Sequence, residues 1–178
     1  MQQEAPSNRH VRHATRADYD SILKIYAHAR DVMKRNGNPS QWGDIYPLAS
    51  DVLHDIELNR SMLLVDDDPQ NGVERLLGVF VICTGPDPTY ASIDGAWLDD
   101  DPYVAFHRVA SSGLARHTAH DMLDWAVRHY RNVRADTHEN NLAMQHIFES
   151  SGFTRCGIIT LPPRKIGIRE RIAFQRHI

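Results

Sequence analysis

The sequence predicts an α/β fold, more closely an α+β sandwich in which helices cover a mixed central sheet. Segments whose apolar residues recur at helical spacing alternate along the chain with short apolar runs that are typical of strands. The 178 residues suffice for one hydrophobic core, so we expect a single domain over residues 1–178, with about residues 1–8 as a flexible tail. No Gly-rich turn follows the first expected strand, which excludes a dinucleotide-binding fold there.

The first third of the chain is expected to form a strand and two helices. Residues 10–14 (HVRHA) form the strand, and Thr15 with Asp18 three residues later is a variant of the capping box that starts helices. The first helix runs to about Asn36, where the sequence Gly-Asn-Pro ends it. Its apolar stripe is Ile22, Leu23, Ile25, Tyr26, Ala29 and Met33. After an aromatic-rich loop, a second helix over 49–58 has Val52, Leu53 and Ile56 on one face.

A hairpin and a further strand are expected in the middle of the chain. The runs 61–65 (SMLLV) and 76–83 (LLGVFVIC) flank a turn-rich linker and predict two paired strands. The Gly-Pro-Asp-Pro sequence from residue 85 breaks the chain, and 103–110 (YVAFHRVA) predicts the next strand. A helix then follows, with the apolar set Ala119, Met122, Leu123, Trp125 and Ala126.

The most informative stretch is 132–157, which reads as strand, loop, helix and strand. Asn140 and Asn141 can cap the helix, whose apolar face is Leu142, Met144, Ile147 and Phe148, and Gly152 can end it. A polar turn between the carboxyl end of a strand and a helix is where open α/β sheets place ligands, so we expect the functional site near this turn. The final strands are expected over 154–161 and 171–175, joined by 162–165.

The composition excludes several classes of function. The net charge of −3 gives no basic field for nucleic acid, and no apolar run approaches the roughly 20 residues that span a membrane. The polar start lacks the apolar core of a signal peptide, so we expect a cytoplasmic protein. Cys83 and Cys156 lie in apolar segments and are expected to be buried free thiols.

Two motifs of this chain are shared with a known family. The first is Asn141, Met144, Phe148 and then Gly-Phe from Gly152, and the second is the strand HRVA, from residue 107, followed by a loop and a helix. From His10 to Gln175, the chain resembles the Gcn5-related N-acetyltransferases (GNAT). The resemblance implies a mixed, mostly antiparallel central sheet flanked by helices, and acetyl-CoA as the donor of the acetyl group.

The resemblance also implies which residues bind acetyl-CoA. The backbone N–H of Val109 or Ala110 would hold the acetyl carbonyl. The loop and helix start after that strand would hold the pyrophosphate, because converging N–H groups at a helix N-terminus bind phosphates. Its members are Leu114, Ala115, Arg116, His117, Thr118 and Ala119. The pantetheine and acetyl arm would be flanked by His138, Asn140, Asn141, Met144 and Phe148.

Phe148 stands where the family usually has a Tyr acid and cannot donate a proton, so either another group or solvent protonates the leaving thiolate. We expect His107 or Tyr103 to contribute, and a neutral imidazole near pH 7 is a competent base. The alternative is that His107 points into the core, because strand side chains alternate between faces.

Substrate contacts are expected from two irregular segments. Trp42 and Tyr46 lie in the loop that overhangs the acceptor site in this family and could wall an amine by cation–π contact, or could be hydrophobic plugs. Trp97 is followed by an acidic trio, 99–101, which is either an acidic mouth for a cationic amine or a solvated turn. His117 and His120 share a helix face but lack a third ligand in register, so no metal is expected.

We therefore predict an acetyl-CoA-dependent N-acetyltransferase that modifies a primary amine of a small molecule or peptide by direct attack. One alternative is a non-catalytic CoA-binding or sensing module, because of Phe148 and a phosphate loop in which Leu114 and His117 replace the usual residues. The other is an interaction protein that forms a homodimer through an exposed strand edge. No membrane or nucleic-acid partner is expected.

Overall fold

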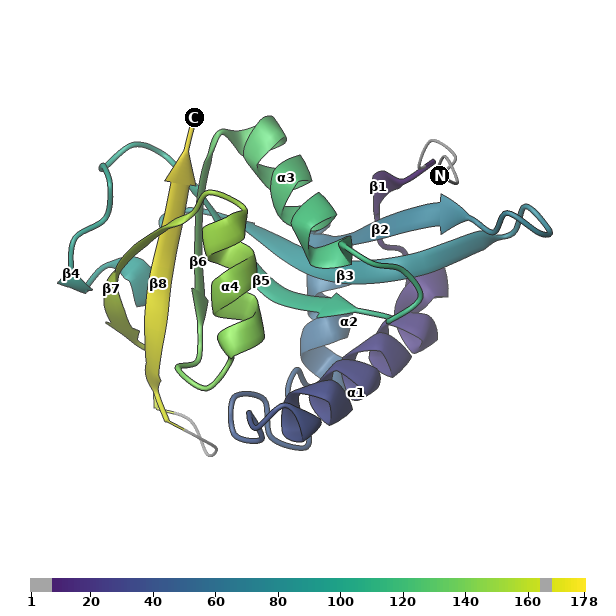
Figure 1. Ribbon diagram of the computed structural model, residues 1–178, viewed down its shortest axis with the longest axis horizontal. Helices are drawn as coiled ribbons and strands as arrows, with labels where there is room; N and C mark the ends of the chain where they lie inside the picture. Colours follow the sequence, from purple (N-terminus) through teal and green to yellow (C-terminus); the bar gives the residue numbers. More distant parts are fainter. Residues whose placement is uncertain (1–7, 164–167) are drawn as a thin grey trace, which may run out of the picture.

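The computed structural model describes residues 8–163 and 168–178, and in them eight strands form one mixed sheet (Figure 1). The strands are β1 (His10–His13), β2 (Ser61–Asp67), β3 (Glu74–Thr84), β4 (Asp94–Gly95), β5 (Val104–Ser111), β6 (Asn132–Thr137), β7 (Thr154–Thr160) and β8 (Glu170–His177). Their order is β1-β2-β3-β5-β6-β8-β7-β4. Every neighbouring pair is antiparallel except β5 and β6, which run parallel, so the predicted fold class is confirmed.

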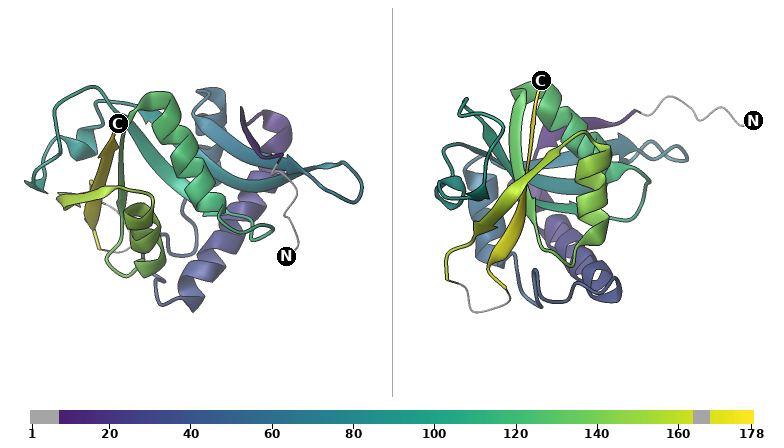
Figure 2. Two further views of the ribbon diagram at one scale, coloured as in Figure 1. Left: turned by 45° about the horizontal axis from the view of Figure 1, so that its top comes forward. Right: turned by 60° about the vertical axis from the view of Figure 1, so that its left-hand side comes forward.

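Helices cover both faces of this sheet (Figure 2). The α-helices in the described ranges are α1 (Tyr19–Arg35), α2 (Ala49–Glu57), α3 (Thr118–Tyr130) and α4 (Leu142–Ser150). The apolar stripe of α1 packs with α2 on one face, against strand residues such as Leu63 and Val79. On the other face, α3 and α4 pack against Phe80 and Phe106. None of the helices in the described part of the chain is long and apolar enough to cross a membrane.

The boundaries of the elements follow the local signals closely. Thr15 and Asp18 form the expected capping box, but it caps a short 3-10 turn (Arg16–Asp18) that leads directly into α1. Gly152 ends α4 with a positive φ of 78°. Between residues 85 and 103, where only a broken loop was expected, the chain forms a second 3-10 turn (Pro88–Tyr90) and the two-residue strand β4. Most of the expected tail over 1–8, and half of the linker 162–165, lie outside the described residues.

The sheet opens between β5 and β6. The two strands pair only where Val104–Phe106 face Val133–Ala135, and beyond these residues their carboxyl ends part. At this point β5 also contains a β-bulge, since Arg108 and Val109 both fall opposite Phe80 of β3. Arg108 has a φ of +52°, a left-handed conformation that is uncommon for a residue other than glycine. Parting strands and a bulge leave the residues after Phe106 without a strand neighbour on the β6 side.

Candidate functional site

A cavity of about 880 Å³ occupies the opening between β5 and β6. Its walls come from α1, the loop between α1 and α2, the second half of β5, the end of β6 and the start of α4. One half, here called the apolar half, is lined by Phe106, Ala119, Met144, Ile147 and Phe148. The polar half is lined by His54, Asp55, Arg60, Cys83, Asp87, Thr89, His107, Arg108, Asp136 and Arg171. The expected site near the turn before α4 therefore coincides with one end of this cavity.

The bulged strand presents backbone donors to the apolar half. The N–H of Ser112 donates to the carbonyl of Leu77 at 2.8 Å, so this residue faces β3. Because successive residues of a strand face opposite sides, the N–H groups of Ser111 and Val109 face the side on which β6 has departed. Of the two predicted donors, Val109 has this orientation, whereas Ala110 pairs with Val79 of β3.

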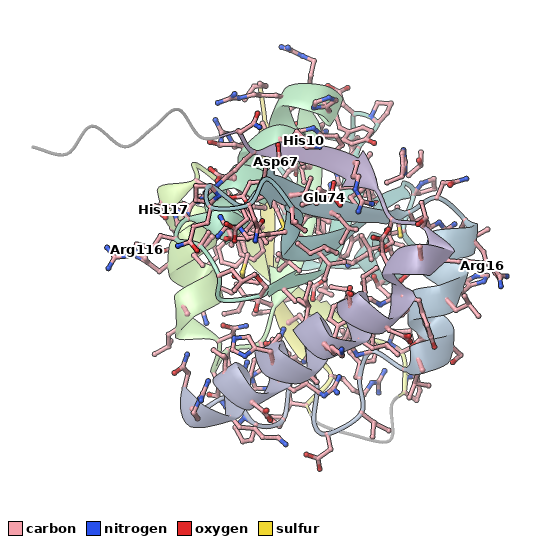
Figure 3. All side chains as sticks on the ribbon, turned by 90° about the vertical axis from the view of Figure 1, so that its right-hand side faces the viewer. His10, Arg16, Asp67, Glu74, Arg116 and His117 are labelled. Atoms are coloured by element: carbon pink, nitrogen blue, oxygen red, sulfur yellow. The ribbon has the colours of Figure 1, made fainter. Side chains whose placement is uncertain are left out.

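The helix start at α3 is a second group of backbone donors. His117 precedes the helix with a φ of +60°, and no side chain caps the first turn. The first N–H groups of the helix thus lack intrahelical partners, and such groups attract anions. Arg116 extends outward from the same loop beside His117 (Figure 3). Within the predicted phosphate loop, Ala119 lines the cavity itself, and Gly113 lines it just before the loop.

The turn before α4 is fixed by side-chain hydrogen bonds. Asn141 is the N-cap, and its Oδ1 accepts from the N–H of Met144 at 3.2 Å. Its Nδ2 donates to Gln41 Oε1 at 2.9 Å, which ties the α1–α2 loop to α4 across the cavity. Asn140 and Met144 also line the cavity. His138 does not, because it is fully buried behind the turn, where its Nδ1 accepts from the N–H of Asn140 and burial lowers its pKa.

His107 lies in the polar half between two carboxylates. Its Nε2–H donates to Asp87 Oδ2 at 2.8 Å, and its Nδ1 lies 3.9 Å from Asp136 Oδ2. Burial raises the pKa of Asp87, but hydrogen bonds from His107 and Thr89 outweigh it and lower the pKa to about 2. A carboxylate that accepts from Nε2–H fixes the tautomer in which Nδ1 is unprotonated. The imidazole can thus take a proton at Nδ1, and the second carboxylate can hold a cation beside it.

Arg108 lines the polar half and contacts Tyr46 and Asp55 there. Its Nε donates to the Tyr46 hydroxyl at 2.9 Å, and its Nη1 donates to the buried carboxylate of Asp55. The hydroxyl of Tyr26 holds the strand at this point by donating to the carbonyl of Arg108 at 3.0 Å. Burial raises the pKa of Asp55, and the charge of Arg108 opposes this effect. Trp42 is buried against Tyr26 and Tyr46, so both predicted aromatic residues of the α1–α2 loop line the cavity.

Tyr103 and Trp97 lie outside the lining of the cavity, as do His138 and residues 114–118 of the predicted phosphate loop. The Tyr103 hydroxyl accepts from the N–H of Asp87 at 2.8 Å, so this residue positions the partner of His107. Trp97 packs on Tyr90. The guanidinium of Arg134 lies over the Trp97 ring, 4.3 Å from its centre, and over the Tyr103 ring, 4.0 Å from its centre. Trp97 therefore does not form a wall for an amine, and the Tyr103 hydroxyl, predicted for the proton chemistry, contacts the backbone of Asp87 outside the lining.

The acidic trio is also away from the cavity. Asp99 accepts from Asn132 and Gln175 through Oδ1, and its Oδ2 accepts from His177 at 2.8 Å. These bonds attach the 92–103 loop to β6 and β8, so Asp99 has a structural role instead of forming an acidic mouth. Both cysteines are free, as expected, but they are half-buried and not fully buried. Cys83 lines the polar half of the cavity.

Four charged side chains of the cavity lining were not expected from the sequence: Asp55, Asp87, Arg108 and Asp136. Asp87 lies in the Gly-Pro-Asp-Pro sequence, which was interpreted only as a chain break. Arg108 was quoted within the strand motif, but nothing in the sequence marks the bulge that brings it to the cavity. A buried-helix Asp such as Asp55 is a signal that could have been noticed, because carboxylates are buried only with partners.

Comparisons with known proteins agree with this geometry. A family model described as an acetyltransferase (GNAT) domain matches residues 9–154. No curated protein matches the sequence. Among solved structures, a GNAT-family acetyltransferase from Streptococcus agalactiae 2603 is 28% identical, with a TM-score of 0.81 over 96% of this chain and 95% of that chain.

Two structures with acetyl-CoA are more distant in sequence. The structure of yncA from Salmonella typhimurium with its cofactor acetyl-CoA is 18% identical, with a TM-score of 0.59 over 96% of this chain and 94% of that chain. A GNAT superfamily phosphinothricin acetyltransferase from Sinorhizobium meliloti, in complex with acetyl-CoA, is 14% identical, with a TM-score of 0.62 over 96% and 89%. At these identities the likeness concerns the fold alone.

Proposed function

The chain belongs to the GNAT acetyltransferase family, and on this basis we propose that it transfers the acetyl group of acetyl-CoA to a primary amine of a small molecule or peptide. One observation carries the proposal. A single cavity joins an apolar half, beside strand N–H groups without a strand neighbour, to a polar half that contains the Asp87–His107 pair. A thioester and an amine could meet where these halves join.

The residues present fit acetyl-CoA. The uncapped first turn of α3 suits a pyrophosphate, and Arg116 adds a positive charge on the loop before it. Met144, Ile147 and Phe148 offer an apolar wall to a pantetheine arm. The N–H of Val109 would donate to the acetyl carbonyl oxygen and stabilise the charge that develops there.

His107 is proposed as the general base. Asp136 would hold the cationic amine, which first gives one proton to His107 Nδ1 and becomes the neutral nucleophile. The amine nitrogen then forms a bond to the acetyl carbon, the carbon–sulfur bond breaks, and the nitrogen releases its second proton to solvent while the leaving thiolate gains one. Phe148 has no proton to give, so the thiolate would be protonated by solvent. Asp87 acts through His107 and is therefore a positioning residue.

Calorimetric titration with acetyl-CoA, followed by a thiol-release assay on a panel of amines, tests the proposal. We expect micromolar binding and turnover, and we expect His107→Asn to lower kcat by about 10²-fold or more with acetyl-CoA affinity kept within twofold. His10→Asn, an exposed histidine on β1 (Figure 3), is the matched control. Absence of binding at high micromolar acetyl-CoA would refute the enzyme, and binding without turnover of any amine would favour a CoA-sensing module.

A further inference from the structure

We propose that the preferred acceptor is a small amino acid, that is, a molecule with a primary amine and a carboxylate, and that Arg108 binds the carboxylate. This proposal rests on the acetyltransferase function proposed above and specifies its acceptor. It comes from three features of the polar half: the bulge in β5, the balance of charges in the lining, and the unused donors of Arg108.

The bulge brings two consecutive side chains to one cavity. In a regular strand the side chains of His107 and Arg108 would point to opposite faces of the sheet. With a φ of +52° at Arg108, both side chains reach the polar half, where one contacts Asp87 and the other contacts Asp55. A strained conformation at a non-glycine residue persists only where the surroundings hold it, and such residues concentrate at functional sites. The amine site at His107 and the guanidinium thereby come from consecutive residues and line one cavity.

The described part of the lining carries both signs of charge. Among residues 8–163 and 168–178, three carboxylates and three guanidiniums line the polar half, namely Asp55, Asp87 and Asp136, and Arg60, Arg108 and Arg171. A simple cationic amine would be matched by a lining of net negative charge. A lining of both charges, with two acids around His107 and the guanidinium of Arg108 in the same cavity, matches a molecule that carries both charges.

Arg108 has donors left for an anion. A guanidinium has five N–H groups in a planar fork, which fits a carboxylate in a bidentate manner. Nε and Nη1 of Arg108 donate to Tyr46 and Asp55, whereas Nη2 has no hydrogen-bond partner among residues 8–163 and 168–178. The side chain is 22% exposed, and it lines the cavity. The bond to Asp55 orients the guanidinium and leaves the Nη2 donors for a ligand.

Matched acceptors test this directly in the wild-type protein. Each L-amino acid is compared with the corresponding amino alcohol, which replaces the carboxylate by a hydroxymethyl group and keeps a primary amine of similar basicity. In a thiol-release assay at saturating acetyl-CoA, we expect kcat/KM for the amino acids to be higher by about tenfold or more, chiefly through KM, since a charge-assisted hydrogen bond is lost with the alcohol.

The double variant Asp55→Asn/Arg108→Gln links the preference to Arg108. Both charges are removed together, because a single change would leave an unpaired buried charge and endanger folding. We expect the preference for amino acids to fall towards unity while acetyl-CoA affinity stays within twofold. Arg16→Gln is the matched control, since Arg16 is exposed on the outer surface and does not line the cavity (Figure 3).

The outcomes separate the two proposals. Equal kcat/KM for amino acids and amino alcohols in the wild-type protein would overturn the amino-acid acceptor and leave the acetyltransferase standing. An undiminished preference in the folded double variant would overturn the assignment of Arg108. Binding of acetyl-CoA without turnover of any acceptor would overturn both proposals. The comparison of acceptors in the wild-type protein decides the acceptor class even if the double variant does not fold.

Discussion

Asp87→Asn removes the charge that holds His107 and changes the shape of the side chain very little. The carboxylate accepts from His107 Nε2 at 2.8 Å, from the N–H of Thr89 at 2.9 Å and from the Thr89 hydroxyl at 2.7 Å. Against the cost of burial, these bonds lower the pKa of Asp87 from 3.8 to about 2. A difference of this size corresponds to about 2 kcal/mol in favour of the ionised form in the folded protein.

The sign of the pH dependence follows from the depressed pKa. The ionised carboxylate binds fewer protons in the folded state than in the unfolded state, so its contribution is fully present above pH 3.8 and is lost as the pH falls through about 2. We expect the free energy of unfolding of the variant at pH 7 to be about 1–2 kcal/mol lower than that of the wild type. The loss is no larger because the amide oxygen can still accept from Thr89. The difference in free energy of unfolding between the wild type and the variant should narrow steadily between pH 4 and pH 2.

The same substitution should lower kcat. Without the carboxylate, the amide NH₂ can donate to Nε2, which favours the tautomer with the proton on Nδ1 and blocks the proposed base. We expect kcat to fall by about 10²-fold with acetyl-CoA affinity unchanged. Urea unfolding between pH 7 and the lowest pH at which the wild type folds gives the stability, and thiol release gives kcat.

Asp31→Asn, an exposed aspartate on α1, is the matched control for both measurements. A kcat for Asp87→Asn that equals the kcat of this control would refute the role of Asp87 in orienting His107. A stability gap that stays constant as the pH approaches 2 would refute the assignment of the depressed pKa to Asp87.

Three further predictions concern other parts of the chain. Asp18→Asn should cost about 1–2 kcal/mol at pH 7, since Arg12 lowers the pKa of Asp18 to about 2, and in urea unfolding the loss should shrink as the pH falls through that value. Phe148→Leu should cost about 1–2 kcal/mol in urea but leave kcat within twofold, because a phenyl ring has no proton to donate; a tenfold lower kcat would contradict this. Asn141→Ala should cost about 1 kcal/mol and raise KM for acetyl-CoA, and an unchanged Tm would contradict the capping role.

The fold could be predicted because its signals are local. Apolar spacing identified α1, α2, α3 and α4. Asn141 caps α4 as expected, and Thr15 caps the 3-10 turn that leads into α1. Strand limits were less accurate: β3 extends to Glu74–Thr84, beyond the expected 76–83, because its ends are fixed by pairing with β2 and β5. Pairing partners lie far apart in the sequence and leave no local mark.

The site could be predicted only in part, because it also depends on contacts between residues that lie far apart in the sequence. His107, Trp42 and Tyr46 were expected at the site, and all three line the cavity. Tyr103 was an equal candidate with His107, but the loop before β5 folds back, so that the ring stacks on Arg134 and the hydroxyl contacts Asp87. Whether a residue next to a strand faces a cavity depends on the course of the neighbouring loop, which the spacing of residues does not encode.

The bulge at Arg108 connects the two halves of the site. It turns the N–H of Val109 to the side left open by β6, and it turns the Arg108 side chain to the polar half. A left-handed conformation at a non-glycine residue costs about 1–2 kcal/mol, and Tyr26 holds it here by donating to the carbonyl of Arg108. Substrate contact and donor contact thus depend on the same backbone distortion, so a change that relaxes the bulge should weaken acceptor selectivity and acetyl-group alignment together.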